Sequence, residues 1–225
     1  MKNIVVIRKV EDLEKIREAK NCDKLSVYLL NDISFDEGHF LLPIDLENTD
    51  VIFYGLGNTI NNLTINNVMS KCSGLFSNVK SLCVKKLKVT EASVIGEEVC
   101  GTLAGYVKEG FVADELELHS VVDSEAMSGG VVGIAKNINI KDSLICTNIS
   151  GKGVIGGIAG SADACEVNNS IVNVSLKPKT SFVSSKLLFD TYVGYLGSRE
   201  KLRVFALTED VFEYLEERDS YKLTL

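Results

Sequence analysis

The chain has 225 residues, of which 45% are hydrophobic and 24% charged, so it can build a core and is not disordered. Its net charge of −7 disfavours direct binding to nucleic acid or to an anionic membrane and favours a protein partner with a basic surface. Charges spread through residues 1–24 do not fit a secretory signal, so we expect a cytoplasmic protein, and the asparagines in the charge-free run 51–70 exclude a membrane helix.

The N-terminal segment combines an apolar strand with an amphipathic helix. Residues Ile4 to Ile7 are consecutive apolar residues that favour a strand. After them, apolar residues recur every three positions with charges between them, which predicts a helix over about residues 10–20 with one buried face: Val10, Leu13, Ile16 and Ala19.

Five short motifs of small and apolar residues recur along the middle of the chain. Their closing residues are spaced by 28, 28, 27 and 37 residues, and they are Ser77, Gly105, Gly133, Gly160 and Gly197. Three nearly equal intervals indicate a solenoid, and the longer last interval predicts an insertion around Pro178 to Leu188.

Apolar residues follow the third and fourth closing glycines at the same offsets. These matched pairs predict short strands whose buried faces recur in each coil: Ile138 and Cys165, Ile140 and Val167, Leu144 and Ile171, and Ile149 and Leu176. In the second repeat Gly110 takes the first of these places, which predicts a bulge in that coil. We expect glycine where the chain turns with positive φ or where neighbouring backbones approach closely.

Repeats of 27 or 28 residues that contain several short strands cannot form a helical solenoid, because its repeats need long segments with a 3.6-residue apolar period. The sequence therefore predicts an all-β fold, a right-handed parallel β-helix (solenoid) of about five to six coils with short N- and C-terminal capping helices. Covers are expected because the open ends of a solenoid would aggregate. At the C-terminus, Thr208 is the expected N-cap of a helix over about residues 208–218. The predicted divisions are 1–28 for the N-terminal cap, 29–197 for the β-helix repeats, and 198–225 for the C-terminal cap helix and tail.

The motifs resemble GLUG-motif repeats, which are named for Gly-Leu-apolar-Gly. The residues that carry the resemblance are 74–76, 101–105, 130–133 and 157–160, together with a lead-in at 31–33, 43–44 and 53–65. The resemblance implies a parallel β-helix. It is nearly silent on activity, because known members are mostly cell-surface or adhesin-type chains.

Candidate chemical groups are few and scattered. The six cysteines include no CxxC pair, and His39 and His119 lie 80 residues apart, so we expect reduced thiols and neither a metal site nor a cofactor. Ser128 and Ser161 stand next to glycines, but nothing in the sequence identifies a base for them, so turn serines are the better interpretation.

One stretch of the repeat region is strongly acidic. Residues 91–125 contain nine acids and a single lysine, whereas residues 77–90 contain four lysines and no acid. A solenoid would stack these two stretches on adjacent coils. The acidic residues either form a solvated face that neighbouring opposite charges stabilise, or they bind a basic surface. The candidate binding residues are Glu109, Asp114, Glu115, Glu117, Asp123 and Glu125.

These observations favour a non-catalytic cytoplasmic binding protein, with no catalytic residues assigned. Its acidic face would engage a basic partner, and it would inhibit a nucleic-acid-handling protein as a mimic of the nucleic-acid backbone, in the manner of phage anti-defence or anti-CRISPR proteins. Two alternatives stay open. One is a polysaccharide-acting β-helix enzyme that uses Asp114 and Glu117 as an acid pair, and the other is a cell-surface adhesin fragment.

Overall fold

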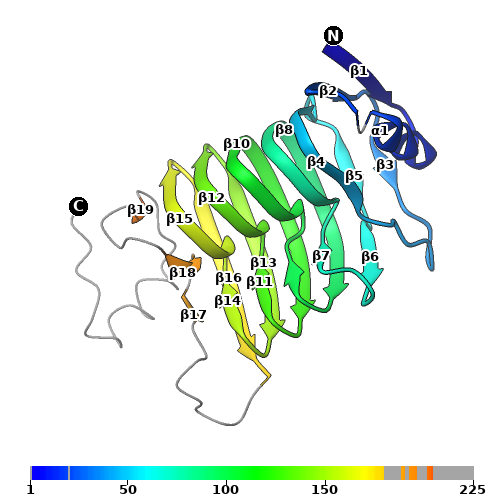
Figure 1. The fold of residues 1–225 in the computed structure, drawn as a ribbon. Coiled ribbons are helices and arrows are strands. Elements are labelled where there is room, and N and C mark those ends of the chain that lie inside the picture. The colour runs from blue at the N-terminus through cyan, green and yellow to red at the C-terminus, as the bar shows by residue number, and fades with distance from the viewer. Residues whose placement is uncertain (1, 20, 180–188, 191–192, 197–201, 205–225) are drawn as a thin grey trace.

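The chain folds as a parallel β-solenoid of about six turns, as the repeat spacing predicted (Figure 1). This computed structural model describes residues 2–19, 21–179, 189–190, 193–196 and 202–204. The predicted C-terminal helix, with Thr208, and the closing residue Gly197 lie outside the described residues, as does most of the predicted insertion.

Three sets of strands wind around the core, and every strand pair among the described residues is parallel. One set runs the length of the solenoid: β1 (Lys2–Ile7), β2 (Lys24–Leu29), β4 (Ile44–Tyr54), β8 (Phe76–Gly96), β10 (Ala104–Ser124), β12 (Val132–Lys141), β15 (Ala159–Asn168), β18 (Val193–Leu196) and β19 (Leu202–Val204).

The long strands β8 and β10 turn a corner and also contribute to the second set, which contains β3 (Ile33–Ser34), β5 (Thr59–Asn61), β6 (Thr64–Asn67), β13 (Leu144–Gly151) and β16 (Ile171–Pro178). The third set has five short strands: β7 (Cys72–Ser73), β9 (Val99–Cys100), β11 (Met127–Gly129), β14 (Val154–Gly156) and β17 (Phe189–Asp190).

The N-terminal helix covers one end of the core. A 3-10 helix, Val10–Leu13, leads into α1, Glu14–Glu18. Leu13 and Ile16 are fully buried and Ala19 nearly so, which confirms the predicted helical face. The strands β1 and β2 pair in register with each other and then with β4, so the same sheet continues to this end.

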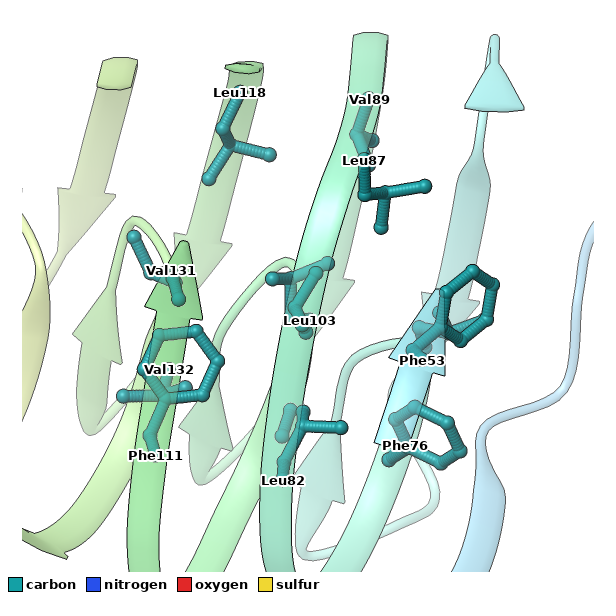
Figure 2. Packing of buried hydrophobic residues seen from close by; sticks show 14 of the residues in the cluster. Phe53, Phe76, Leu82, Leu87, Val89, Leu103, Phe111, Leu118, Val131 and Val132 are labelled. Carbon is teal, nitrogen blue, oxygen red and sulfur yellow. The ribbon is translucent and has the colours of Figure 1, made fainter. Parts of the chain in front are cut away.

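The core consists of apolar columns that run along the solenoid (Figure 2). Each fully buried apolar side chain contributes roughly 1.5–3 kcal/mol to folding. Ile138 lies beside Cys165, and Ile140 beside Val167, as predicted, and all four side chains are buried. The column that contains Ile140 consists, in coil order, of Val27, Phe53, Val84, Ala113, Ile140 and Val167.

The prediction for the next column was wrong by one residue. Leu144 does lie beside Ile171, but Leu144 is only half-buried and Ile171 is 50% exposed. The buried column contains Ile145 and Val172 instead. A left-handed residue, Asp142, turns the corner before this strand and changes which alternate residues point inward.

The predicted bulge lies in β10. Two residues, Lys108 and Glu109, stand between Val107 and Gly110, whereas one residue occupies this interval in β8 and in β12. As a result Phe111 and Ala113, and not Gly110, continue the two buried columns.

The repeat glycines serve close packing and not positive φ. A Cβ on Gly129 would lie 2.1 Å from the carbonyl oxygen of Val132 and 2.4 Å from the Cα of Ala159. Among the described residues, glycines with positive φ are Gly38 and Gly57, both outside the motifs.

The fifth motif also needs a correction. Val193 pairs with Ala159 and Tyr195 with Ser161, so Gly194, not Gly197, takes the place beside Gly160.

Candidate functional site

The six predicted acidic residues lie in three places along the coil that β10 begins. Glu109 is in the bulge, Asp114, Glu115 and Glu117 are at the following corner, and Asp123 and Glu125 lie beyond the next straight segment. At about 3.3 Å per residue, Glu109 and Asp114 are separated by roughly 16 Å of strand, and Glu117 and Asp123 by roughly 20 Å. The structure brings together the three corner acids and, separately, the last two.

The corner at Asp114, Glu115 and Glu117 contains a left-handed residue on each of four coils. Equivalent positions on four successive coils have φ between 45° and 56°, and none of them is glycine: Lys86, Glu115, Asp142 and Asn169. This conformation is strained for a residue with a Cβ. Stacking supplies side-chain contacts that compensate in part, since the Asn169 amide donates a hydrogen bond to the Asp142 carboxylate. The pKa of Asp142 is lowered by this bond and by Lys141.

At this corner the lysine-rich stretch of β8 lies against the acidic stretch of β10. In register, Lys85 is beside Asp114 and Lys88 beside Glu117. The Nζ of Lys86 is 3.2 Å from a carboxylate oxygen of Glu115, and the Nζ of Lys88 is 3.0 Å from one of Glu117. Opposite charges are therefore stacked on adjacent coils, as the sequence predicted.

The acidic row, meaning Asp114, Glu115 and Glu117, also has a lysine beside it on the following coil. Lys141 of β12 is the register partner of Asp114, and the charge of Asp114 contributes to raising the pKa of Lys141, after the larger effects of Asp142. Glu117 lies 3.7 Å from the Nε2 of His119. The carboxylates of Glu115 and Glu117 stay accessible, because their side chains are 50% and 35% exposed.

The second acidic group forms a separate ion-pair network. Glu125 pairs with Lys152, and Lys179 pairs with both Asp123 and Glu125. The hydrogen bond from Lys152 lowers the pKa of Glu125, while the hydrogen bond to Asp123 raises the pKa of Lys179. These acids form ion pairs with lysines that come later in the chain, whereas Glu115 and Glu117 form ion pairs with lysines that come earlier.

Other candidate groups do not assemble into a reactive site in the described part of the chain. Ser128 is buried, and its Oγ has no hydrogen-bond partner there, while Ser161 is half-buried on β15. No group of three or more His, Cys, Asp or Glu side chains among the described residues is placed to hold a metal ion. Asp114 and Glu117, the acid pair of the enzyme alternative, lie on either side of Glu115 on the outer surface.

The cysteines are a further group that the sequence singles out. Cys22, Cys72, Cys83, Cys100 and Cys146 are free thiols. Burial raises the pKa of Cys100 to about 12, so this thiol is unreactive.

Two surface features near the N-terminus were not predicted from the sequence. The first is a pair of stacked rings, Tyr28 and Tyr54, whose centroids are 4.8 Å apart on adjacent coils. Their spacing of 26 residues, close to one repeat, was the signal. The second is a polar pocket of about 250 Å³ beside the cap, lined by Arg8, Lys9, Val10, Glu11, Asp32, Ile33, Ser34, Asp36 and His39. Its lining residues come from two segments, 8–11 and 32–39, that lie together only in the folded chain, so no local sequence pattern predicts the pocket.

A search among known protein families and among curated proteins gives no match to this sequence. One solved structure, a "putative immunoglobulin A1 protease" from Bacteroides ovatus, aligns over 87% of this chain and 84% of its own, with a TM-score of 0.44 and 14% identity. So distant a similarity carries no argument about activity. Within the described residues, no helix is long and apolar enough to cross a membrane.

Proposed function

We propose that this protein is a non-catalytic cytoplasmic binding module, built from GLUG-type repeats, whose β10 carboxylates bind a basic macromolecular partner. The observation that carries the proposal is the corner of Asp114, Glu115 and Glu117, where three acids within four residues project from a rigid turn. The six predicted binding residues therefore fall into two groups. The corner acids are the primary contact, and Glu109, Asp123 and Glu125 are peripheral.

The corner is suited to binding because two of its carboxylates are accessible and each has one lysine partner. Glu115 and Glu117 are each held by one lysine of β8, yet a carboxylate offers about four lone-pair sites. An arginine from a partner can therefore bind a free carboxylate oxygen without breaking the pair.

The neighbouring charges restrict the shape of the partner. Lysines of β8 flank the acidic row on one side and Lys141 flanks it on the other, so the negative region is a narrow stripe. In this role the chain is an inhibitor that occupies the basic surface of a nucleic-acid-handling protein. The stripe fits a single row of arginines or lysines better than a wide basic groove.

Two matched variants with a deca-arginine peptide as the probe test this proposal. The acid variant carries Asp114→Asn, Glu115→Gln and Glu117→Gln, and the lysine variant carries Lys85→Gln, Lys86→Gln and Lys88→Gln. Both lose the same two inter-coil ion pairs, so both are destabilised to a similar extent. They differ in the sign of the charge that they remove.

We expect the acid variant to bind the peptide at least tenfold more weakly than the wild type at low salt, a loss of about 1.4 kcal/mol. The lysine variant should bind it more tightly, because a competing charge is gone. Equal affinity for the wild type and the acid variant, or equal weakening in both variants, would show that the corner charges only stabilise the fold.

A further inference from the structure

The first strand of the sheet has an open edge. β1 is at the end of the strand order and pairs only with β2 among the described residues. The carbonyl of Ile7 accepts a hydrogen bond from the N–H of Leu30, which fixes the residues of β1 whose backbone groups face β2. Because backbone groups alternate between the two edges of a strand, those of Lys2, Ile4 and Val6 point to the open edge.

This edge has few of the devices that usually prevent edge-to-edge pairing. Natural edge strands are short or carry proline, bulges or charges, whereas β1 is six residues long, contains no proline, and has a single charged residue, Lys2, at its start. Its outward residue Ile4 is 63% exposed. The cap packs against the core and not along this edge. Leu13 and Ile16 are buried in the core, and the Arg17 guanidinium donates a hydrogen bond to the carbonyl oxygen of Pro43, which precedes β4.

We propose that β1 pairs in antiparallel fashion with β1 of a second copy, which joins two solenoids end to end about a two-fold axis. With Ile4 opposite Ile4 of the other copy, Lys2 lies opposite Val6, and all three edge-facing residues of both strands find partners. This register keeps outward side chains on the outward face. It also places the two Lys2 positions about 13 Å apart along the paired strands.

A second copy is favoured over an unrelated strand because the surface next to the edge is self-complementary. On the outer face Val6 is followed by Tyr28 and the stacked Tyr54. Two copies joined at β1 would place two such apolar and aromatic surfaces next to each other, which continues the same surface across the junction. An isologous contact of this kind closes on itself and does not form fibres.

Sedimentation of the full chain over a range of concentrations tests the proposal. We expect the wild type to form a reversible dimer, and Ile4→Lys, which places like charges on the two-fold axis, to weaken the dimer at least tenfold. Val112→Lys is the matched control, because Val112 is an outward apolar residue, 42% exposed, on the inner strand β10. It should dimerise as the wild type does. At a concentration where the wild type is monomeric, both variants should unfold at the wild-type urea concentration.

Ile4→Cys gives an independent measurement. Opposed residues in a hydrogen-bonded antiparallel pair have Cα atoms about 5.5 Å apart, which suits a disulfide. Mild oxidation should yield a covalent dimer with Ile4→Cys, but not with the wild type or with Val121→Cys, which alters a residue 49% exposed elsewhere. A monomeric wild type at all concentrations, dimerisation of Ile4→Lys, or cross-linking only to other proteins would overturn the proposal.

Discussion

The N-terminal coils and the middle coils have the same core but opposite outer faces. A single outward column reads apolar and aromatic over β1, β2 and β4 and then charged over β8, β10 and β12: Val6, Tyr28, Tyr54, Lys85, Asp114 and Lys141. The inward column beside it stays apolar throughout. The inward columns therefore determine the fold. The outward columns can differ from coil to coil, and so they are free to provide the surfaces that bind partners.

The largest effect is expected inside the middle coils. Ile140 is fully buried between Ala113 and Val167, so Ile140→Asp places an unpaired charge in the column and should cost more than about 4 kcal/mol of the free energy of unfolding. The neighbouring Asn139→Asp alters an exposed position and should change little. Urea unfolding followed by circular dichroism compares the two, and similar midpoints would mean that the column is misassigned.

A smaller loss is expected where coils approach most closely. Gly129→Ala should destabilise by about 3 kcal/mol, because the added Cβ would meet backbone atoms of Val132 and Ala159 that cannot move independently. Gly110→Ala is the control, since the nearest atom to its Cβ is the carbonyl oxygen of Asn137 at 3.7 Å. If the two alanine variants have the same unfolding free energy, close approach is not the reason for glycine in these motifs.

The N-terminal region should respond to acid through Asp12. The pKa of its carboxyl falls from the usual 3.8 to about 2, first because of Lys15 and then because of the backbone N–H of Arg8. A lowered folded-state pKa stabilises the fold above pH 3.8, and this contribution is lost as the pH falls toward 2.

Asp12→Asn removes this carboxylate while keeping the size of the side chain. Its deficit in unfolding free energy relative to the wild type should therefore be full at pH 6 and mostly lost at pH 2, where the folded-state carboxyl is about half protonated. Urea titrations at several pH values measure the difference, and a deficit that does not vary with pH would contradict the account.

The smallest effect concerns a single inter-coil ion pair. Lys86 and Glu115 are 61% and 50% exposed, so a double-mutant cycle with Lys86→Gln and Glu115→Gln should give a coupling below about 1 kcal/mol that falls as salt is added. A coupling of several kcal/mol would assign the middle coils' charges to stability and weaken their assignment to recognition.

Repeat spacing was enough to predict the solenoid, the inward columns of Ile138 and Ile140, and the bulge near Gly110, because stacked coils must repeat their apolar faces. It failed at Leu144, because the apolar offsets do not show where the chain turns at Asp142. Aspartate favours the left-handed conformation, but Lys86 and Glu115, which adopt it on earlier coils, do not. The pairing of acidic and lysine-rich stretches followed from the period. The division of the acids among separate places did not, because it depends on where the coil turns.

Two adjacent columns test the central claim, that inward residues determine the fold and outward residues do not. The outward column is Cys83, Val112 and Asn139, and the inward one is Leu82, Phe111 and Ile138. With all three residues changed to serine, the outward variant should unfold cooperatively within about 1.5 kcal/mol of the wild type. The inward variant should show no cooperative urea transition, since each large-to-small change costs about 2–5 kcal/mol. Equal destabilisation of the two variants would contradict the account.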